Sequence, residues 1–114
     1  MIMVYGIKNC DTMKKTFQWL DKHKLRYEFH DYKKLGVDTT VLTAACKKLG
    51  WDKLLNRRGT TWRKLPDKVK ENIDEKSAFE IMLKQPSIIK RPLIIHKNHV
   101  VVGVEDQQLR QLLK

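Results

Sequence analysis

The first thirty residues carry the hydrophobic pattern of a strand, a helix and a second strand. A continuous apolar run over residues 2–5 predicts a short buried strand. Apolar residues then recur at helical spacing between charged ones, at Met13, Phe17 and Leu20. This spacing predicts a helix from about Thr12 to His23, which Asp11 or Thr12 could cap. Alternation over residues 27–32 predicts a second strand, so the segment has the pattern of a βαβ unit with parallel strands.

The middle of the chain has the pattern of a series of helices. An apolar stripe follows the sequence DTT and ends at Gly50, with its members at Leu42, Ala45, Cys46 and Leu49. Shorter helices are expected at about 51–56 and 67–72. A further helix is expected from about Ser77 to Lys84, because Pro86 would stop it. Its expected buried residues are Phe79, Met82 and Leu83.

The C-terminal part returns to strands and then to a helix. Two β-branched segments, PLII at 92–95 and VVVG at 100–103, flank the polar sequence HKNH and predict an antiparallel hairpin. The sequence EDQQLRQLLK at 105–114 predicts a closing helix. The order βαβ, helices, ββα is that of a thioredoxin-like α/β fold. We therefore expect one domain over residues 1–114 with a helical insertion at approximately 37–86.

The composition narrows the expected environment. With 41% hydrophobic residues the chain can bury a modest single core. The N-terminal apolar run is too short for a signal peptide and no segment approaches membrane-spanning length, so we expect a cytoplasmic protein without membrane contact. The two cysteines, Cys10 and Cys46, are too few for a disulfide framework, and the histidines lack zinc-ligand spacing. We therefore expect free thiols and no metal.

The formal charge of +11 raises the question of an anionic partner. Lys and Arg total 24 against 13 Asp and Glu, but they occur in pairs along the whole chain rather than in one block. This distribution favours a solvated, generally anion-attracting surface over a dedicated nucleic-acid stripe. The sequence around Gly50 does not fit a helix-turn-helix motif, because the second helix would contain the sequence NRRGTT at 56–61, which has an interior glycine. The sequence therefore argues against nucleic acid as the partner.

Cys10 is the leading candidate for chemistry. It stands between the first expected strand and the first expected helix, and a helix N-terminus stabilises a thiolate. Lys8 and Lys14 add positive charge nearby, and the polar neighbour Asn9 favours an exposed reactive thiol over a buried cysteine that acts as a small hydrophobe. Cys46 shares an apolar helix face, so core packing is favoured for it over a resolving role.

Arg91 and Pro92 immediately precede an apolar strand. A proline is tolerated at the first residue of a strand. The sequence does not indicate whether the peptide bond between Arg91 and Pro92 is cis or trans. Spacing alone supports two roles for Arg91 equally, binding an anion or lying on the surface.

Three segments carry a family resemblance: YGIKNCDTMKK at 5–15, NRR at 56–58 and KRPLII at 90–95. With them, nearly the whole chain resembles the arsenate reductase (ArsC)/Spx family, in its short YffB-like branch. The resemblance implies a thioredoxin-like fold with a helical insertion and a cis-proline, here Pro92, beside the cysteine. In the arsenate reductases one cysteine attacks the oxyanion, glutathione supplies the second thiol and arginines hold the anion. Cys10 matches the nucleophile and Arg91 an anion-binding arginine.

Three positions depart from the family pattern. Asn56 stands where the arsenate enzymes have an arginine, with Arg57 and Arg58 following it, and Gly103 stands where they have another. Because an oxyanion needs several positive donors, these departures argue against arsenate chemistry. Met13 interrupts the CxxC common in Spx regulators, which argues against a disulfide-switched regulator.

The expected function is that of a glutathione-dependent thiol reductase with Cys10 as nucleophile. Glutathione is expected as co-substrate, with no bound cofactor, and a small thiol or disulfide compound is the expected substrate. The residues expected to bind glutathione or substrate are Lys8, Asn9, Arg57, Arg58, Arg91 and Pro92. The alternatives are an arsenate reductase, and an Spx-like regulator that binds RNA polymerase without catalysis.

Overall fold

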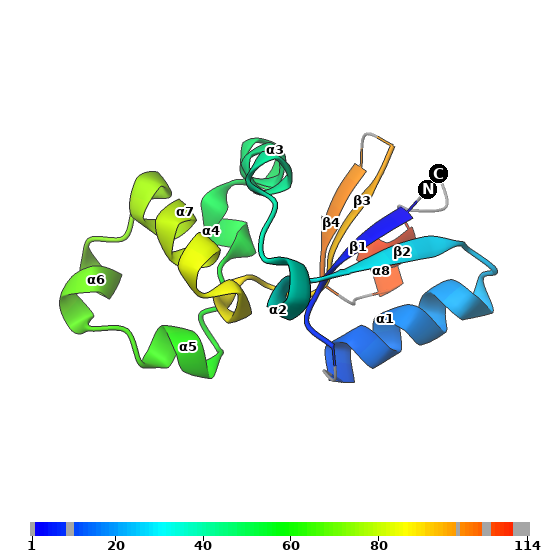
Figure 1. Ribbon diagram of the computed structural model, residues 1–114, viewed down its shortest axis with the longest axis horizontal. Helices are drawn as coiled ribbons and strands as arrows, with labels where there is room; N and C mark the ends of the chain where they lie inside the picture. The colour runs from blue at the N-terminus through cyan, green and yellow to red at the C-terminus, as the bar shows by residue number, and fades with distance from the viewer. Residues whose placement is uncertain (1, 9–10, 98, 104–105, 111–114) are drawn as a thin grey trace. The chain divides into compact units, whose positions relative to one another are not determined.

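The computed structural model of the chain describes residues 2–8, 11–97, 99–103 and 106–110 (Figure 1). The chain divides into two compact units. The first comprises Met1–Leu35 and Arg91–Lys114, and the second comprises Gly36–Lys90. No helix in the described ranges is both long and apolar enough to span a membrane. The expectation of one domain with an insertion at about 37–86 stays a prediction.

The first unit is built on a sheet of four strands. In chain order they are β1 (Ile2–Gly6), β2 (Tyr27–Asp31), β3 (Leu93–His96) and β4 (His99–Val102). Their order across the sheet is β2-β1-β3-β4, with β1 parallel to β2 and the other two pairs antiparallel (Figure 1). The helix α1 (Asp11–Lys22) connects the parallel pair. This βαβ…ββ arrangement confirms the α/β, thioredoxin-like fold predicted from the pattern.

One core cluster holds α1 and α8 (Asp106–Leu109) against the sheet. Its buried members are Ile2, Val4, Met13, Leu20, Ile94, Val101 and Leu109. Thr16 is also fully buried, and its hydroxyl donates to the carbonyl of Thr12 at 2.9 Å, which satisfies the buried polar group. Phe17, expected on the buried face, is half-buried instead and stacks on Tyr27 with ring centroids 5.1 Å apart.

The hairpin is tighter than the sequence predicts. His96 and His99, expected in the turn, pair with each other as the last residues of β3 and the first of β4. Lys97 follows with a φ of 55°, and Asn98 lies outside the described residues. The prediction of a closing helix is confirmed over Asp106–Leu109, whereas its expected continuation at 111–114 lies outside the described residues. A short helix missing from the prediction, α2 (Tyr32–Leu35), follows β2 directly.

The second unit is helical. Its elements are α3 (Thr39–Leu49), α4 (Trp51–Leu54), α5 (Thr60–Arg63), α6 (Asp67–Glu71), α7 (Glu75–Lys84) and the 3-10 helix η1 (Pro86–Ile88). Side chains of aspartate cap two of them: Asp38 accepts from two backbone amides of α3, and Asp74 forms a capping box with Ser77 at α7. Among these helices, α5 was not predicted and α7 begins two residues earlier than expected.

Buried aliphatic residues and a short strand-like contact hold this unit together. The buried residues are Leu42, Ala45, Leu54, Leu55, Ala78, Met82, Ile88 and Ile89. Leu55 and Ile89 form an isolated antiparallel bridge, flanked by a hydrogen bond from the Lys90 amide to the Leu54 carbonyl at 2.8 Å. The expected burial of Met82 is confirmed, whereas Phe79 and Leu83 are only half-buried and Ala78 is the other buried residue of α7.

Candidate functional site

The carboxyl end of β1 gathers residues from three other parts of the first unit. Gly6 pairs with Asp31 of β2, and Tyr5 pairs with Leu93 at the start of β3. The amide of Gly103 donates to the carbonyl of Pro92 at 3.1 Å, which ties the end of β4 to the entry of β3. Gly103 has a φ of 104°, a conformation that favours glycine. The ends of all four strands therefore meet where the chain leaves β1 for α1.

The first turn of α1 packs against Gly6. A Cβ atom placed on Gly6 would lie 2.6 Å from Sδ of Met13, and the Met13 side chain is 1% exposed. The methionine in the position of a second CxxC cysteine is therefore a core residue. Asp11 begins α1 with an exposed side chain.

The nucleophile predicted from the sequence lies outside the described residues. Cys10 and its neighbour Asn9 both fall in this gap, so their roles stay predictions. Lys8, which precedes them, is described and exposed. The connection that contains them joins the carboxyl end of β1 to the N-terminus of α1.

Arg91 and Pro92 lie at this same end of the sheet. The peptide bond between them is cis, as the family resemblance implies and as spacing alone left open. Pro92 is buried and Arg91 is half-buried. Within the described part of the chain Arg91 takes part in no ion pair with a carboxylate. Its positive charge is therefore not neutralised by those residues.

A group of aromatic rings lies at this end of the sheet. The ring of Tyr5 is 5.1 Å from that of His30 and 6.5 Å from that of Tyr32, measured between centroids. Burial raises the pKa of the Tyr32 phenol, and the neighbouring Tyr5 raises it further, whereas the positive charge of Arg91 lowers it. Tyr32 is 3% exposed and is therefore a neutral hydroxyl at physiological pH. Sequence reasoning missed this group, because its members come from β1, β2, α2 and the entry of β3.

Arg57 and Arg58 belong to the second unit. Arg57 forms an ion pair with Asp52, and its guanidinium carbon lies 5.4 Å from the centroid of a Trp62 ring. The amide of Arg58 donates to Oδ1 of Asn56 at 3.1 Å, and the Arg58 side chain is exposed. Their expected contribution to glutathione binding stays a prediction.

Cys46 lies on α3 and is a free, half-buried thiol rather than the core residue expected. Burial raises its pKa, and the carboxylate of Glu75 at the start of α7 adds to the effect. The thiolate is therefore disfavoured at Cys46, which is the reverse of what a nucleophile requires.

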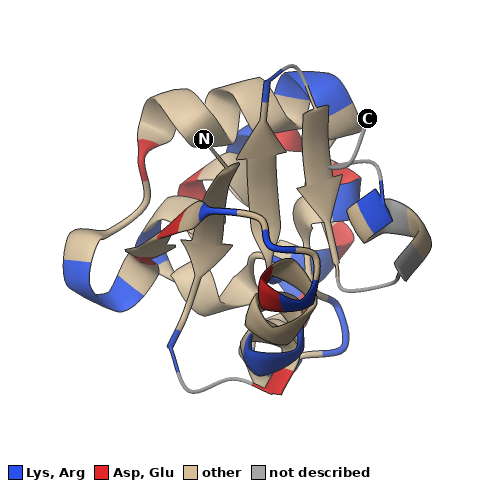
Figure 2. Ribbon diagram, turned by 90° about the vertical axis from the view of Figure 1, so that its right-hand side faces the viewer, with Lys and Arg blue, Asp and Glu red and all other residues tan. Residues whose placement is uncertain are grey.

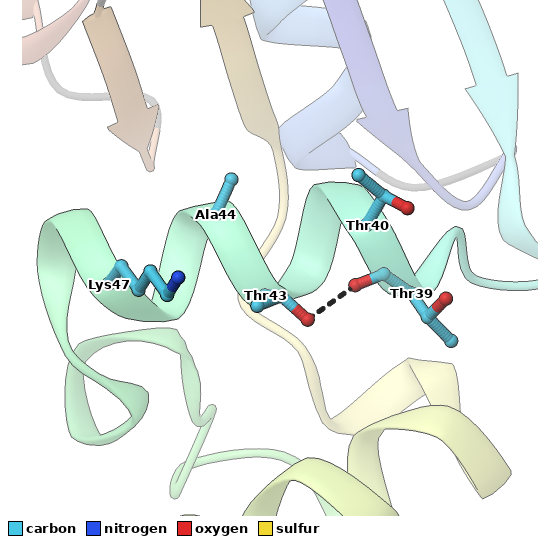
Figure 3. A pocket seen from close by; sticks show the side chains of 5 residues that line it. All are labelled: Thr39, Thr40, Thr43, Ala44 and Lys47. Carbon is cyan, nitrogen blue, oxygen red and sulfur yellow. Dashed lines mark hydrogen bonds between the residues drawn. The ribbon is translucent and has the colours of Figure 1, made fainter.

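A metal centre and a surface hollow are the two other kinds of site to compare with this one. The described residues contain no group of three or more His, Cys, Asp or Glu side chains that could hold a metal ion. Among the described residues, those that line a surface hollow of about 390 Å³ belong to α3: Thr39, Thr40, Thr43, Ala44 and Lys47 (Figure 3). The hydroxyl of Thr43 donates a hydrogen bond to the carbonyl of Thr39 at 2.7 Å. Within the described ranges of the chain, the lining of this hollow includes none of the residues predicted for the site and no thiol, imidazole or carboxylate.

The basic residues are concentrated on helices and loops. None of the four strands contains Lys or Arg, whereas basic side chains occur on most of the helices (Figure 2). The prediction of a distributed basic surface agrees with this pattern.

Comparisons with known proteins place this arrangement among related chains. A model of the ArsC family matches residues 5–112. A solved structure of a YffB protein is 46% identical, with 100% of each chain covered and a TM-score of 0.94. An arsenate reductase (ArsC) related protein from Brucella melitensis is 49% identical, with 99% of this chain and 94% of that one covered and a TM-score of 0.78. The global transcriptional regulator Spx of Listeria innocua is 24% identical over 115 residues, which cover 99% of this chain and 87% of the regulator.

Proposed function

The chain belongs to the ArsC family, and from this premise we propose that it is a glutathione-dependent thiol reductase with Cys10 as its nucleophile. The observation that supports the proposal best is the position of Arg91, which precedes β3 at the end of the sheet where β1 also ends. The connection that carries Cys10 leaves the sheet at that end, and Arg91 supplies a half-buried positive charge there.

The proposed reaction exchanges one disulfide for another. The Cys10 thiolate attacks a sulfur of the substrate disulfide, forms a mixed disulfide and releases the first substrate thiol after protonation. A glutathione thiolate then attacks the Cys10 sulfur, releases the second substrate thiol and leaves glutathione on Cys10. A second glutathione displaces the first and restores the Cys10 thiolate. Two glutathione thiols are thus oxidised to glutathione disulfide while the substrate disulfide is reduced to two thiols.

An external second thiol fits the residues that the structure describes. Met13 carries no thiol and is packed beneath Gly6, and the half-buried Cys46 has a raised pKa. Glutathione carries a net negative charge that suits Arg91 and the exposed Lys8. The carbonyl of Pro92 is already bonded to Gly103, so the main chain of Arg91 is the part proposed to pair with the extended tripeptide.

Mass spectrometry of the intact protein tests the proposal. Oxidised glutathione should add one glutathione to the wild-type chain and to Cys46→Ser, and none to Cys10→Ser. Reduced glutathione should remove the adduct. Arg91→Gln should raise the KM for glutathione more than it lowers kcat, because the arginine is assigned to binding. A disulfide between Cys10 and Cys46, or a Cys46→Ser variant that stays folded but loses reductase activity, would contradict the assignment.

Arsenate reduction is the second candidate, since the Brucella melitensis relative is described as related to arsenate reductase. Asn56 and Gly103 occupy positions where the arsenate enzymes have arginines. A charge-assisted hydrogen bond is worth about 1.5–3 kcal/mol, so each loss would slow the reaction about tenfold to a hundredfold. A glutathione-coupled arsenate assay decides between the candidates, and efficient turnover would favour arsenate.

A non-catalytic regulator is the third candidate, because the chain is also related to Spx. In that case Cys10→Ser should still capture a partner protein, such as RNA polymerase, in a pull-down experiment. Under the reductase proposal the same substitution abolishes turnover.

A further inference from the structure

The segment that includes α5 and α6 is locally rich in basic residues. Between residues 57 and 70 there are six basic residues and one acidic residue, Asp67. The basic residues are Arg57, Arg58, Arg63, Lys64, Lys68 and Lys70. All of them except the half-buried Lys70 are exposed. Asp52 and Glu71 flank the segment, and Asp52 forms an ion pair with Arg57.

The ring of Trp62 contacts two of these cations. The guanidinium carbon of Arg57 lies 5.4 Å and Nζ of Lys70 lies 6.0 Å from the centroid of a Trp62 ring. Both distances are within the range of a cation–π interaction. The indole therefore brings together charges from two segments that would otherwise repel each other. We call Arg57, Trp62, Arg63 and Lys70, with the adjacent Arg58 and Lys64, the Trp62 cluster.

Hydrogen bonds fix the backbone beneath the Trp62 cluster. Nζ of Lys70 donates to the carbonyl of Arg63 at 3.0 Å, which links α6 to α5. The hydroxyls of Thr61 and Ser87 are 2.6 Å apart and link α5 to η1. A Cβ atom on Gly59 would lie 2.9 Å from the Asn56 side chain, so the turn before α5 is closely packed. A backbone held in this way loses little conformational entropy when a partner binds, so the cost of ordering falls on the side chains.

We propose that the Trp62 cluster is a docking surface for an acidic segment of another protein. The surplus of basic side chains matches carboxylates, and guanidinium groups bind them in a bidentate manner. Nucleic acid fits less well, because the aromatic ring already holds two cations and a base that stacked on it would have to displace one. This surface shares Arg57 and Arg58 with the residues expected to bind glutathione, so the variants that test it leave both arginines unchanged.

A matched pair of charge variants tests the proposal in the full-length chain. The cluster variant is Arg63→Gln, Lys64→Gln and Lys70→Gln. The control variant is Lys22→Gln, Lys33→Gln and Lys34→Gln, which removes the same charge from exposed positions of the first unit. The probe is a fluorescein-labelled decapeptide in which glutamate alternates with alanine, titrated by fluorescence anisotropy at low salt. A labelled hexathymidylate with five phosphates matches its charge.

The wild-type chain should bind the peptide saturably and more tightly than the oligonucleotide. The cluster variant should bind the peptide about fivefold to thirtyfold more weakly, since it loses the ion pairs of the exposed Arg63 and Lys64 and of the half-buried Lys70, and the control should stay within about twofold of wild type. Equal weakening in both variants, tighter binding of the oligonucleotide, or undetectable peptide binding would each overturn the proposal. If circular dichroism shows that the cluster variant is unfolded, Arg63→Gln with Lys64→Gln is compared with Lys33→Gln and Lys34→Gln under the same criteria.

Discussion

The close approach of Met13 to Gly6 predicts that Gly6→Ala destabilises the protein. The new Cβ would lie 2.6 Å from Sδ and 2.9 Å from Cε of Met13, so the methionine has to move. Because Met13 is 1% exposed and belongs to the core cluster, it cannot escape into solvent. Such overpacking costs about 1–3 kcal/mol. Gly6 does not have a positive φ, so the alanine also stiffens the unfolded chain, which offsets about 0.4–1 kcal/mol.

The net expectation for Gly6→Ala is a loss of about 1–2 kcal/mol, which combines the two opposing effects. Urea unfolding followed by circular dichroism should show a midpoint lowered by about 0.5–1 M, given an m-value of about 2 kcal/mol/M. Met13→Ala alone should cost about 2–5 kcal/mol because it leaves a cavity. The double variant should lose about 1–2 kcal/mol less unfolding free energy than the two single losses added together. The alanine at position 6 no longer clashes with a methionine in that variant. A Gly6→Ala protein as stable as wild type, or strictly additive effects, would refute this reasoning.

Three further predictions concern groups outside this contact. Burial lowers the pKa of His96, and the charges of Lys97 and His99 lower it further. The neutral imidazole therefore contributes stability above the ordinary pKa of about 6.5, and this contribution is lost as the pH falls below that value. Between pH 7.5 and pH 5.5 the melting temperature should fall more for the wild type than for His96→Gln. In a Cys10→Ser background, Glu75→Gln should speed iodoacetamide labelling of Cys46 at pH 8, because Glu75 raises the thiol pKa, although burial should keep the rate below that of a free cysteine; an unchanged rate would contradict the assigned charge effect. Asp38→Ala should cost about 1 kcal/mol in urea unfolding, because it removes the acceptor for the Thr40 and Val41 amides, whereas Asp38→Asn should cost much less.

The fold could be predicted where periodicity is strong. The first strand, α1 and β2 follow from the spacing of apolar residues, and their bounds agree within one or two residues. The α5 helix could not be found in this way, because its four residues contain one large apolar side chain, Trp62, and show no period. The buried face of α1 includes Thr16 rather than Phe17. A threonine can occupy a core position when its hydroxyl donates a hydrogen bond to a carbonyl of its own helix, here that of Thr12.

The site could be predicted only in its local parts. Arg91 and Pro92 stand out in the sequence, but the cis state of their peptide bond is set by the surrounding fold and has no local signal. The neighbourhood of Tyr5, Tyr32 and Arg91 arises because separate strands end at the same edge of the sheet. No residue spacing within one segment could have indicated it.

The conformation of Gly103 bears on how anion specificity could change in the course of evolution. Its φ of 104° is unfavourable for a residue with a side chain, and its amide holds the carbonyl of Pro92. Gly103→Arg would therefore place a guanidinium here at a cost of about 1–3 kcal/mol in backbone strain, and would disturb the hydrogen bond to the Pro92 carbonyl. A substitution that introduces an arginine does not by itself provide the backbone conformation that an arginine favours. A side chain at this position is therefore accommodated well only if the backbone after β4 also changes its conformation.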